Sequence, residues 1–99
     1  MIMILLRLLI YLKGNWKNKM WHIYILQCRG KTFYTGITTD LNRRVEEHNT
    51  STLGAKYTRG RRPVKLVYSS SSKDRSKALK EEFRIKQLSR DEKIKLIKK

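Results

Sequence analysis

Glu82 is the residue in this sequence whose position most clearly calls for a chemical explanation. The segment 76–88 has helical periodicity, and its apolar side consists of four residues: Ala78, Leu79, Phe83 and Ile85. At about 100° per residue, Glu82 falls about 40° from the first of these and inside the apolar arc, whereas Glu81 falls outside it. A carboxylate facing a core is costly unless it is paired or binds a metal. Both explanations stay open with equal weight, the pairing partner being Lys86 one turn later or an arginine from elsewhere.

Two tyrosines on neighbouring predicted strands are the next candidates. A hairpin loop of residues 28–30, with Gly30 in the left-handed conformation, would pair Gln27 with Lys31. That register places Tyr24 directly opposite Tyr34, so both phenols would lie on one face of the sheet. A two-residue loop would put them on opposite faces. Taken singly, each is more simply explained as a strand aromatic that covers a core.

Arg44 and His48 lie four residues apart on a predicted helix and are therefore neighbours on its surface. His48 shares a stripe with Leu41 and Val45, and a histidine on an apolar helix face is more often a core residue than a catalyst. An isolated arginine such as Arg44 is usually solvated or ion-paired. Neither residue indicates a function without the others.

The elements that must position these residues follow from the pattern of apolar, β-branched and turn residues. Strands are predicted at 21–27, 33–38 and 64–68, and helices at 41–49, 76–88 and 91–97. The run Ser69 to Ser72 is predicted to be flexible, and Ser89 to Glu92 is predicted to form a capping box. The fold class is therefore α+β, a small three-stranded antiparallel sheet flanked by helices in the order β-β-α-β-α-α.

Size and charge limit the partners of the chain. Its 99 residues suffice for one domain, and 24 lysines and arginines against 8 acidic residues give a net charge of +16. Such a charge favours a polyanionic partner, although an anionic membrane surface would also attract it. Cys28 is the only cysteine, which excludes an intrachain disulfide and a thiolate-based structural zinc site. A reduced, cytoplasmic location is expected.

The first 19 residues differ from the remainder, so the chain divides into an extension, 1–19, and a domain, 20–99. Residues 1–12 are almost wholly apolar and residues 13–20 are polar and basic. An apolar run of about 12 residues is shorter than the roughly 20 of a membrane helix, so no stable membrane insertion is expected. The first hypothesis is that Met20 is the native start, and the second is that the extension associates with membranes.

The candidate residues together match an ordered set of motifs. The tripeptides are His22-Ile23-Tyr24 and Tyr34-Thr35-Gly36, whose tyrosines are ten residues apart; Arg44 follows ten residues later, and His48 one turn after it. Ala78-Leu79-Lys80-Glu81-Glu82 matches an Ala-Leu-x-x-Glu pattern. In these features residues 21–97 resemble the GIY-YIG nucleases, and closely the small stand-alone UPF0213-type members. The chain departs from the pattern in having His22 for the first glycine and no asparagine after Asn49.

The resemblance implies a metal-dependent endonuclease that hydrolyses phosphodiester bonds, in DNA rather than RNA, with one Mg²⁺ or Mn²⁺ ion. Glu82 would hold the cation and Arg44 would grip the phosphate. Tyr24 is the candidate general base, its pKa lowered by Arg44 and the metal, while Tyr34 and His48 would position or relay protons. The choice of base among these three stays open. Gly36 would let backbone and phosphate approach closely.

A basic segment supplies the expected nucleic-acid contacts. Lys56, Arg59, Arg61 and Arg62 would contact phosphates, and Tyr57 would stack on a base. The alternative for this segment is an ordinary solvated loop, although it contains no acidic residue. Two other functions are carried forward: a noncatalytic nucleic-acid-binding module that retains the fold, and a membrane-surface factor that uses residues 1–12 as an anchor. Repair or processing of unusual DNA is expected by analogy alone.

Overall fold

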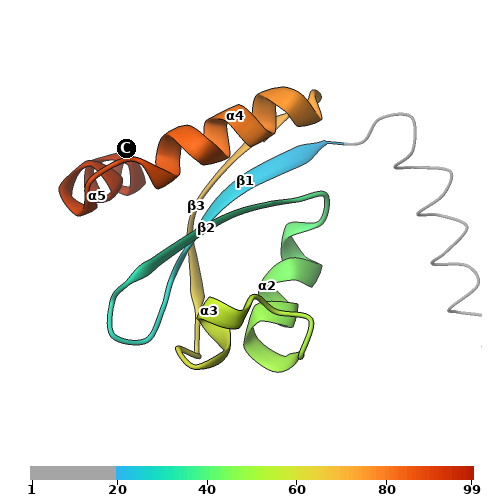
Figure 1. Cartoon of the computed structure of the whole chain (residues 1–99), viewed down its shortest axis with the longest axis vertical. Helices are drawn as coiled ribbons and strands as arrows, with labels where there is room; N and C mark the ends of the chain where they lie inside the picture. Colours follow the sequence, from blue (N-terminus) through green and yellow to red (C-terminus); the bar gives the residue numbers. More distant parts are fainter. Residues whose placement is uncertain (1–19) are drawn as a thin grey trace, which may run out of the picture.

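The computed structural model describes residues 20–99, and the predictions made for residues 1–19 lie outside this range. Its strands are β1 (Trp21–Gln27), β2 (Phe33–Thr38) and β3 (Lys65–Ser72). Its helices are α2 (Leu41–Thr50), α3 (Lys56–Arg59), α4 (Arg75–Lys86) and α5 (Arg90–Lys98). Helices α4 and α5 lie on one side of the sheet, and α2 and α3 lie on the other (Figure 1). The predicted α+β class is confirmed, with the one-turn α3 as an addition in the basic segment.

The sheet is antiparallel, with β1 in the centre and the strand order β2-β1-β3. The predicted hairpin register is wrong: Gln27 pairs with Phe33 rather than Lys31, and Tyr24 pairs with Gly36. The connection is longer than expected because left-handed backbone occurs at both Gly30, with φ of 87°, and Lys31, with φ of 68°. Tyr34 pairs with Leu26, two residues from Tyr24, so the two phenols still share a face.

The serine run is part of β3 and not a flexible linker. Ser69 pairs with Tyr24 and Ser72 with Trp21, so β3 continues to the beginning of β1. The main chain explains this result, because a central strand needs hydrogen-bond partners on both edges, whatever the side chains opposite. The register also shifts between Ile25 and Leu26, where β3 contains one extra residue.

Different side chains cover the two faces of the sheet. Below α4 and α5 the buried core is aliphatic: Ile23, Ile25, Ala78 and Ile85. On the α2 side the buried residues are more polar, with Tyr24, Leu26, Cys28 and Val64 in one cluster and His48 and Thr58 fully buried beside them. The sheet therefore separates an aliphatic layer from a layer that contains hydrogen-bonding groups.

The helix ends follow their capping residues and differ from the predicted ends by one or two residues. The Asp40 carboxylate accepts from the amide of Arg43 at the start of α2. Ser89 and Glu92 form the predicted capping box at the start of α5. None of the helices within residues 20–99 combines the length and the apolar content that crossing a bilayer requires.

Candidate active site

The ring of Tyr24 lies against β2 at Gly36, and only glycine fits there. A Cβ atom added to Gly36 would stand 2.6 Å from the Tyr24 hydroxyl, well inside van der Waals contact. Gly36 was expected to let a phosphate approach closely, whereas the phenol of Tyr24 takes the space above it. Gly36 therefore positions Tyr24, which is 1% exposed, and an approach of phosphate at this position remains a prediction.

A chain of hydrogen bonds connects Tyr24 to the α3 side of the molecule. The Thr58 hydroxyl donates to the carbonyl of Ala55 at 2.9 Å, so its lone pairs are left to accept from His48 Nδ1 at 2.8 Å. With its proton on Nδ1, His48 has a free lone pair on Nε2, which stands 2.8 Å from the Tyr24 hydroxyl. Tyr24 therefore donates to His48.

The pKa shifts of Tyr24 and His48 agree with this direction of the hydrogen bond. Burial raises the pKa of Tyr24 to about 12, even though Arg44 lowers it, and the charges of Tyr34 and Glu82 add to the rise. Burial, assisted by the charge of Arg44, lowers the pKa of His48 to about 4. The expected lowering of the Tyr24 pKa is therefore wrong for the protein alone, because desolvation outweighs the guanidinium. At neutral pH the phenol is protonated and the imidazole is neutral.

Arg44 is held by two acceptors beside the tyrosine. Its Nη1 donates to Glu47 Oε1 at 2.9 Å and to the carbonyl of Leu53 at 2.8 Å. Burial lowers the pKa of Arg44, but hydrogen bonds with Glu47 and Tyr24 raise it overall. Glu47 was not identified from the sequence, although its position three residues after Arg44 on a helix was a signal that could have found it. These contacts fix a permanent positive charge beside the Tyr24 hydroxyl.

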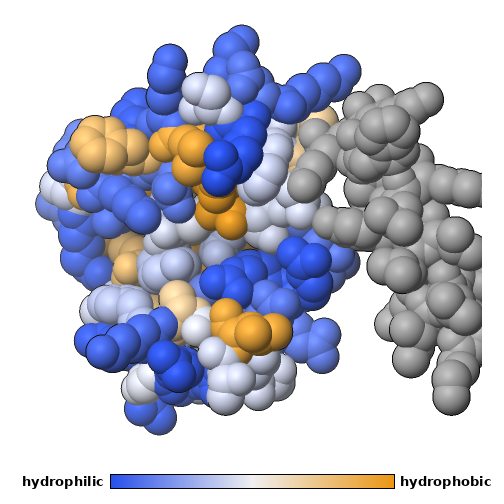
Figure 2. Space-filling view, turned by 45° about the vertical axis from the view of Figure 1, so that its right-hand side comes forward, coloured by the Kyte–Doolittle hydropathy of each residue, from blue (hydrophilic) through white to orange (hydrophobic). Residues whose placement is uncertain are grey.

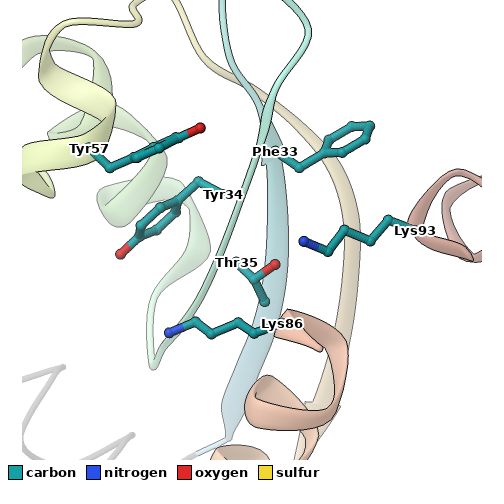
Figure 3. A pocket seen from close by; sticks show the side chains of 6 residues that line it. All are labelled: Phe33, Tyr34, Thr35, Tyr57, Lys86 and Lys93. Atoms are coloured by element: carbon teal, nitrogen blue, oxygen red, sulfur yellow. The ribbon is translucent and has the colours of Figure 1, made fainter. Parts of the chain in front are cut away.

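Aromatic rings extend the site from Tyr24 toward the surface. The ring centroid of Tyr34 lies 6.4 Å from that of Tyr24 and 5.1 Å from that of His48. Tyr57 stacks on Tyr34 at 6.1 Å with an interplanar angle of 25°, and the guanidinium of Arg61 covers the Tyr57 ring at 3.9 Å. The pair of Tyr34 and Tyr57 is visible in Figure 3. The ring of Tyr57 is therefore already in contact with Tyr34 and Arg61.

Glu82 belongs to α4, on the other side of the sheet from His48 and Arg44. Its side chain is 19% exposed, and Lys86 Nζ lies 3.6 Å from Oε2, a long contact for an ion pair. The ion pair considered from the sequence is therefore present. Glu82 is nevertheless close enough to Tyr24 for its charge to raise the pKa of the phenol. The site thus extends around the exposed edge of the sheet at β2.

The donor set near Glu82 suits a weakly protein-bound divalent cation. Residues 20–99 contain no group of three or more histidine, cysteine or carboxylate side chains that could hold a metal. Mg²⁺ commonly binds through one or two carboxylates and completes its shell with water and substrate phosphates. A single carboxylate that is shielded but solvent-accessible fits this mode of binding, and it does not fit a closed structural metal site.

The basic segment divides between structural and exposed side chains. Arg62 donates from Nε to the carbonyl of His48 at 2.6 Å and from Nη2 to the carbonyl of Ser51, so it caps the end of α2. Arg61 donates to the carbonyl of Tyr57 at 2.8 Å. Lys56 and Arg59 are exposed on α3. The phosphate contacts expected of these residues remain predictions. To contact a phosphate, Arg62 would have to break its hydrogen bonds to the carbonyls of His48 and Ser51.

Comparison with known proteins agrees with this arrangement. The family model described as the GIY-YIG catalytic domain matches residues 20–95. A UPF0213 protein of Desulfotalea psychrophila is 56% identical over 78 residues, which cover 79% of this chain and 71% of that protein. A UPF0213 protein of Halobacterium salinarum is 54% identical over 74 residues, covering 75% of this chain and 95% of that protein.

Solved structures give the same result. The solution structure of a UPF0213 protein from Bacillus halodurans has a TM-score of 0.53 and 42% identity, covering 80% of this chain and 83% of that chain. A solution structure of a protein from E. faecalis has a TM-score of 0.57 and 39% identity, covering 81% of this chain and 84% of that chain. Sequence motifs, strand order and relatives agree, and the chain belongs to the GIY-YIG family.

Proposed function

We propose that this protein is a metal-dependent endonuclease that hydrolyses phosphodiester bonds in DNA. The observation that carries the proposal is the hydrogen-bonded pair of Tyr24 and His48, which lies beside a fixed guanidinium and within the electrostatic range of Glu82. A buried tyrosine, an imidazole with a free lone pair and a cation are the groups that proton transfer at a phosphate requires. An architectural role alone would not need them together.

In the proposed reaction, the Tyr24 oxygen takes a proton from the attacking water while its own proton passes to Nε2 of His48. The hydrogen bond between the two side chains already has the necessary direction. The low pKa of His48 opposes the transfer, and Arg44 contributes to that low value. An anionic phosphate bound to Arg44 offsets its charge, so substrate binding favours protonation of His48. Tyr34 lies within reach to position the water or the phosphate.

Glu82 is the residue that would hold the divalent cation, Mg²⁺ or Mn²⁺. Such an ion, when bound, polarises the phosphodiester and stabilises the departing oxyanion. Without a cation, the ammonium group of Lys86 is the partner that partly neutralises the Glu82 carboxylate. Glu82 would have to release this contact with Lys86 in order to hold a cation.

The charge of the protein supports the choice of a nucleic acid as substrate. Lysines and arginines exceed acidic residues by 24 to 8, and Lys56 and Arg59 on α3 are exposed near Tyr34 and Tyr57. DNA rather than RNA, and a role in repair or processing of unusual structures, rest on analogy with the family. We propose the cytoplasm as the location, which is supported by the free, buried thiol of Cys28.

The second candidate function is a noncatalytic nucleic-acid-binding module with the same fold. The high pKa of Tyr24 and the ion pair of Glu82 with Lys86 favour it, since both oppose the states that catalysis needs. The charge of the protein supports either function equally.

One experiment separates the two candidates. Purified residues 20–99 and the full chain are incubated with branched, single-stranded and duplex DNA and with RNA, in Mg²⁺, Mn²⁺ or EDTA. The nuclease hypothesis expects cleavage that needs the metal and falls at least about 10²-fold in Glu82→Gln. The matched control is Glu46→Gln, because Glu46 is exposed on α2 and carries the same charge. Binding without metal-dependent cleavage of any substrate would establish the module instead.

Metal binding is measured independently of cleavage. Titration calorimetry with Mn²⁺ should detect weak binding to the wild-type protein and to Glu46→Gln, and none to Glu82→Gln. Equal Mn²⁺ binding by all three proteins would remove Glu82 from the metal site, whatever the cleavage assay shows.

A further inference from the structure

A pocket of about 210 Å³ lies beside the catalytic pair, at the open edge of β2. Six residues line it: Phe33, Tyr34, Thr35, Tyr57, Lys86 and Lys93. They come from the edge strand, from α3 and from both C-terminal helices, and Figure 3 shows them around a common opening. Tyr34 belongs both to this pocket and to the aromatic cluster around His48, so the pocket adjoins the site described above.

Thr35 is the first sign that this pocket holds a ligand. The residue is 4% exposed, and its hydroxyl is the one buried side-chain oxygen or nitrogen within the described part of the chain that has no hydrogen-bond partner. Thr38, on the same strand and 5% exposed, exchanges hydrogen bonds with the main chain of Asp40. A buried hydroxyl without a partner is costly, and such groups are few in native proteins. A ligand in the pocket would supply the missing acceptor.

Two ammonium groups are the second sign, and they are independent of the first. Lys86 comes from α4 and Lys93 from α5, and their side chains reach toward the pocket on either side of Thr35 (Figure 3). The carboxylate of Glu82 partly compensates Lys86 through a long contact of 3.6 Å. Within residues 20–99 no ion pair is recorded for Lys93. Like charges directed at one pocket repel unless an anion lies between them.

We infer that this pocket binds a second backbone phosphate of the nucleic acid, next to the phosphate that is cut. Lys86 and Lys93 would neutralise it, and the Thr35 hydroxyl would donate to one of its oxygens. Phe33 and Tyr57, on the rim, would contact the adjoining sugar and base. The inference rests on the proposed function for its substrate, because the pocket shares Tyr34 with the active site. It assigns two binding residues, Lys86 and Lys93, outside the motifs quoted for the family resemblance, and it gives a role to the Thr35 side chain inside one of them.

The test replaces single phosphates instead of whole substrates. Fluorescein-labelled DNA oligonucleotides, single-stranded and duplex, carry one neutral methylphosphonate at successive positions, and their binding is measured by fluorescence anisotropy in EDTA, where no cleavage occurs. In wild-type protein, the methylphosphonate at one position of the oligonucleotide should weaken binding about tenfold, and the other positions should have a smaller effect. In Lys93→Met, the methylphosphonate at that position should not weaken binding further. The slope of the logarithm of the binding constant against the logarithm of the salt concentration should also fall by about one.

Matched variants separate this site from general charge. Lys95→Met removes the same charge from an exposed position on α5, and it should leave the methylphosphonate effect unchanged. Thr35→Val removes the hydroxyl and keeps the shape, so the melting temperature should stay constant or rise while the methylphosphonate effect is reduced. Thr38→Val, by contrast, should lower the melting temperature, because that hydroxyl has partners.

The outcomes distinguish this inference from the proposed function. Wild-type protein that shows the position-specific effect but never cleaves would support the phosphate site and overturn the nuclease. Cleavage with an equal methylphosphonate effect in wild type and Lys93→Met would support the nuclease and overturn the site. Competition by millimolar inorganic phosphate, without an effect at any internal position, would assign the pocket to a free anion and also overturn the inference.

Discussion

The two faces of the sheet bury different kinds of side chain, and burial has a different effect on each face. The core below α4 and α5 is aliphatic, and its buried residues Ile23, Ile25 and Ile85 have no polar side-chain atoms. Thr35, opposite Ile25 on the edge strand, adds one buried hydroxyl to this face. The opposite face contains Tyr24, His48 and Thr58, each at most 1% exposed and each hydrogen-bonded. Burial stabilises the first face directly. On the second, burial shifts pKa values and fixes proton positions, which only a rigid scaffold can maintain.

The largest expected effect on cleavage comes from removing the hydroxyl oxygen of Tyr24. Tyr24→Phe keeps the ring over Gly36 but removes the hydroxyl that donates to His48. Metal-dependent cleavage should fall about 10²- to 10⁴-fold in single-turnover measurements. Tyr68→Phe is the control, because Tyr68 packs against the aliphatic cluster. Equal rates for wild type and Tyr24→Phe would show that the phenol takes no part in the reaction.

A large-to-small substitution in the aliphatic core should lower the stability of the protein and leave the cleavage rate unchanged. Ile25 is 0% exposed in that core, so Ile25→Ala should lower the free energy of unfolding by about 2–5 kcal/mol. The cleavage rate per folded molecule should remain near the wild-type value at low temperature. Urea denaturation followed by circular dichroism measures the first quantity. A loss of rate without a loss of stability would show that Ile25 affects the reaction and does more than stabilise the fold.

Acid should destabilise the protein through His48. Its pKa is about 4 in the folded protein and 6.5 ordinarily. Between these values the unfolded chain binds the extra proton, so stability falls as pH decreases from about 6.5 to 4, by roughly 3 kcal/mol. Above pH 6.5 this contribution is constant. The comparison is with His48→Gln, whose stability should lack this part of the pH dependence in urea titrations, and parallel pH profiles would refute the prediction.

The smallest effect concerns the contact between Lys86 and Glu82. Lys86→Gln removes the ammonium group that competes with a cation for the carboxylate. Because half-exposed ion pairs contribute less than about 1 kcal/mol, Mn²⁺ affinity without DNA should rise by at most about fivefold. Calorimetric titration measures the Mn²⁺ affinity of Lys86→Gln. The control is Lys80→Gln, which removes an exposed lysine from the same helix. Weaker Mn²⁺ binding in Lys86→Gln would show that the lysine assists the site.

The sequence predicted that the two tyrosines share one face of the sheet, although the hairpin register was wrong. The predicted loop of residues 28–30 and the observed connection of residues 28–32 both contain an odd number of residues, so either length keeps Tyr24 and Tyr34 on one side. The extra residues reflect a left-handed lysine, Lys31, which no propensity rule favours.

Other parts of the site depended on contacts between distant elements. Thr58 orients His48 from a one-turn helix that the sequence analysis described as a basic loop. Arg62, expected to contact phosphate, caps α2 because the folded chain brings it beside the carbonyls of His48 and Ser51. Helical periodicity placed Glu82 within an apolar arc of α4, but two residues that defined this arc, Leu79 and Phe83, are 37% and 67% exposed. The direction of the Tyr24 pKa shift required the burial that only the packed structure shows.

The location of the site at an edge strand has a consequence for how the protein acts in a cell. Arg44 and His48 come from the layer on one side of β2, and Glu82 comes from the layer on the other. No single layer therefore holds the proposed machinery, and a chain in which either layer has detached would retain its positive charge and lose the proposed cleavage activity. The proposed nuclease would therefore bind nucleic acid without cleaving it until both layers have folded onto the sheet.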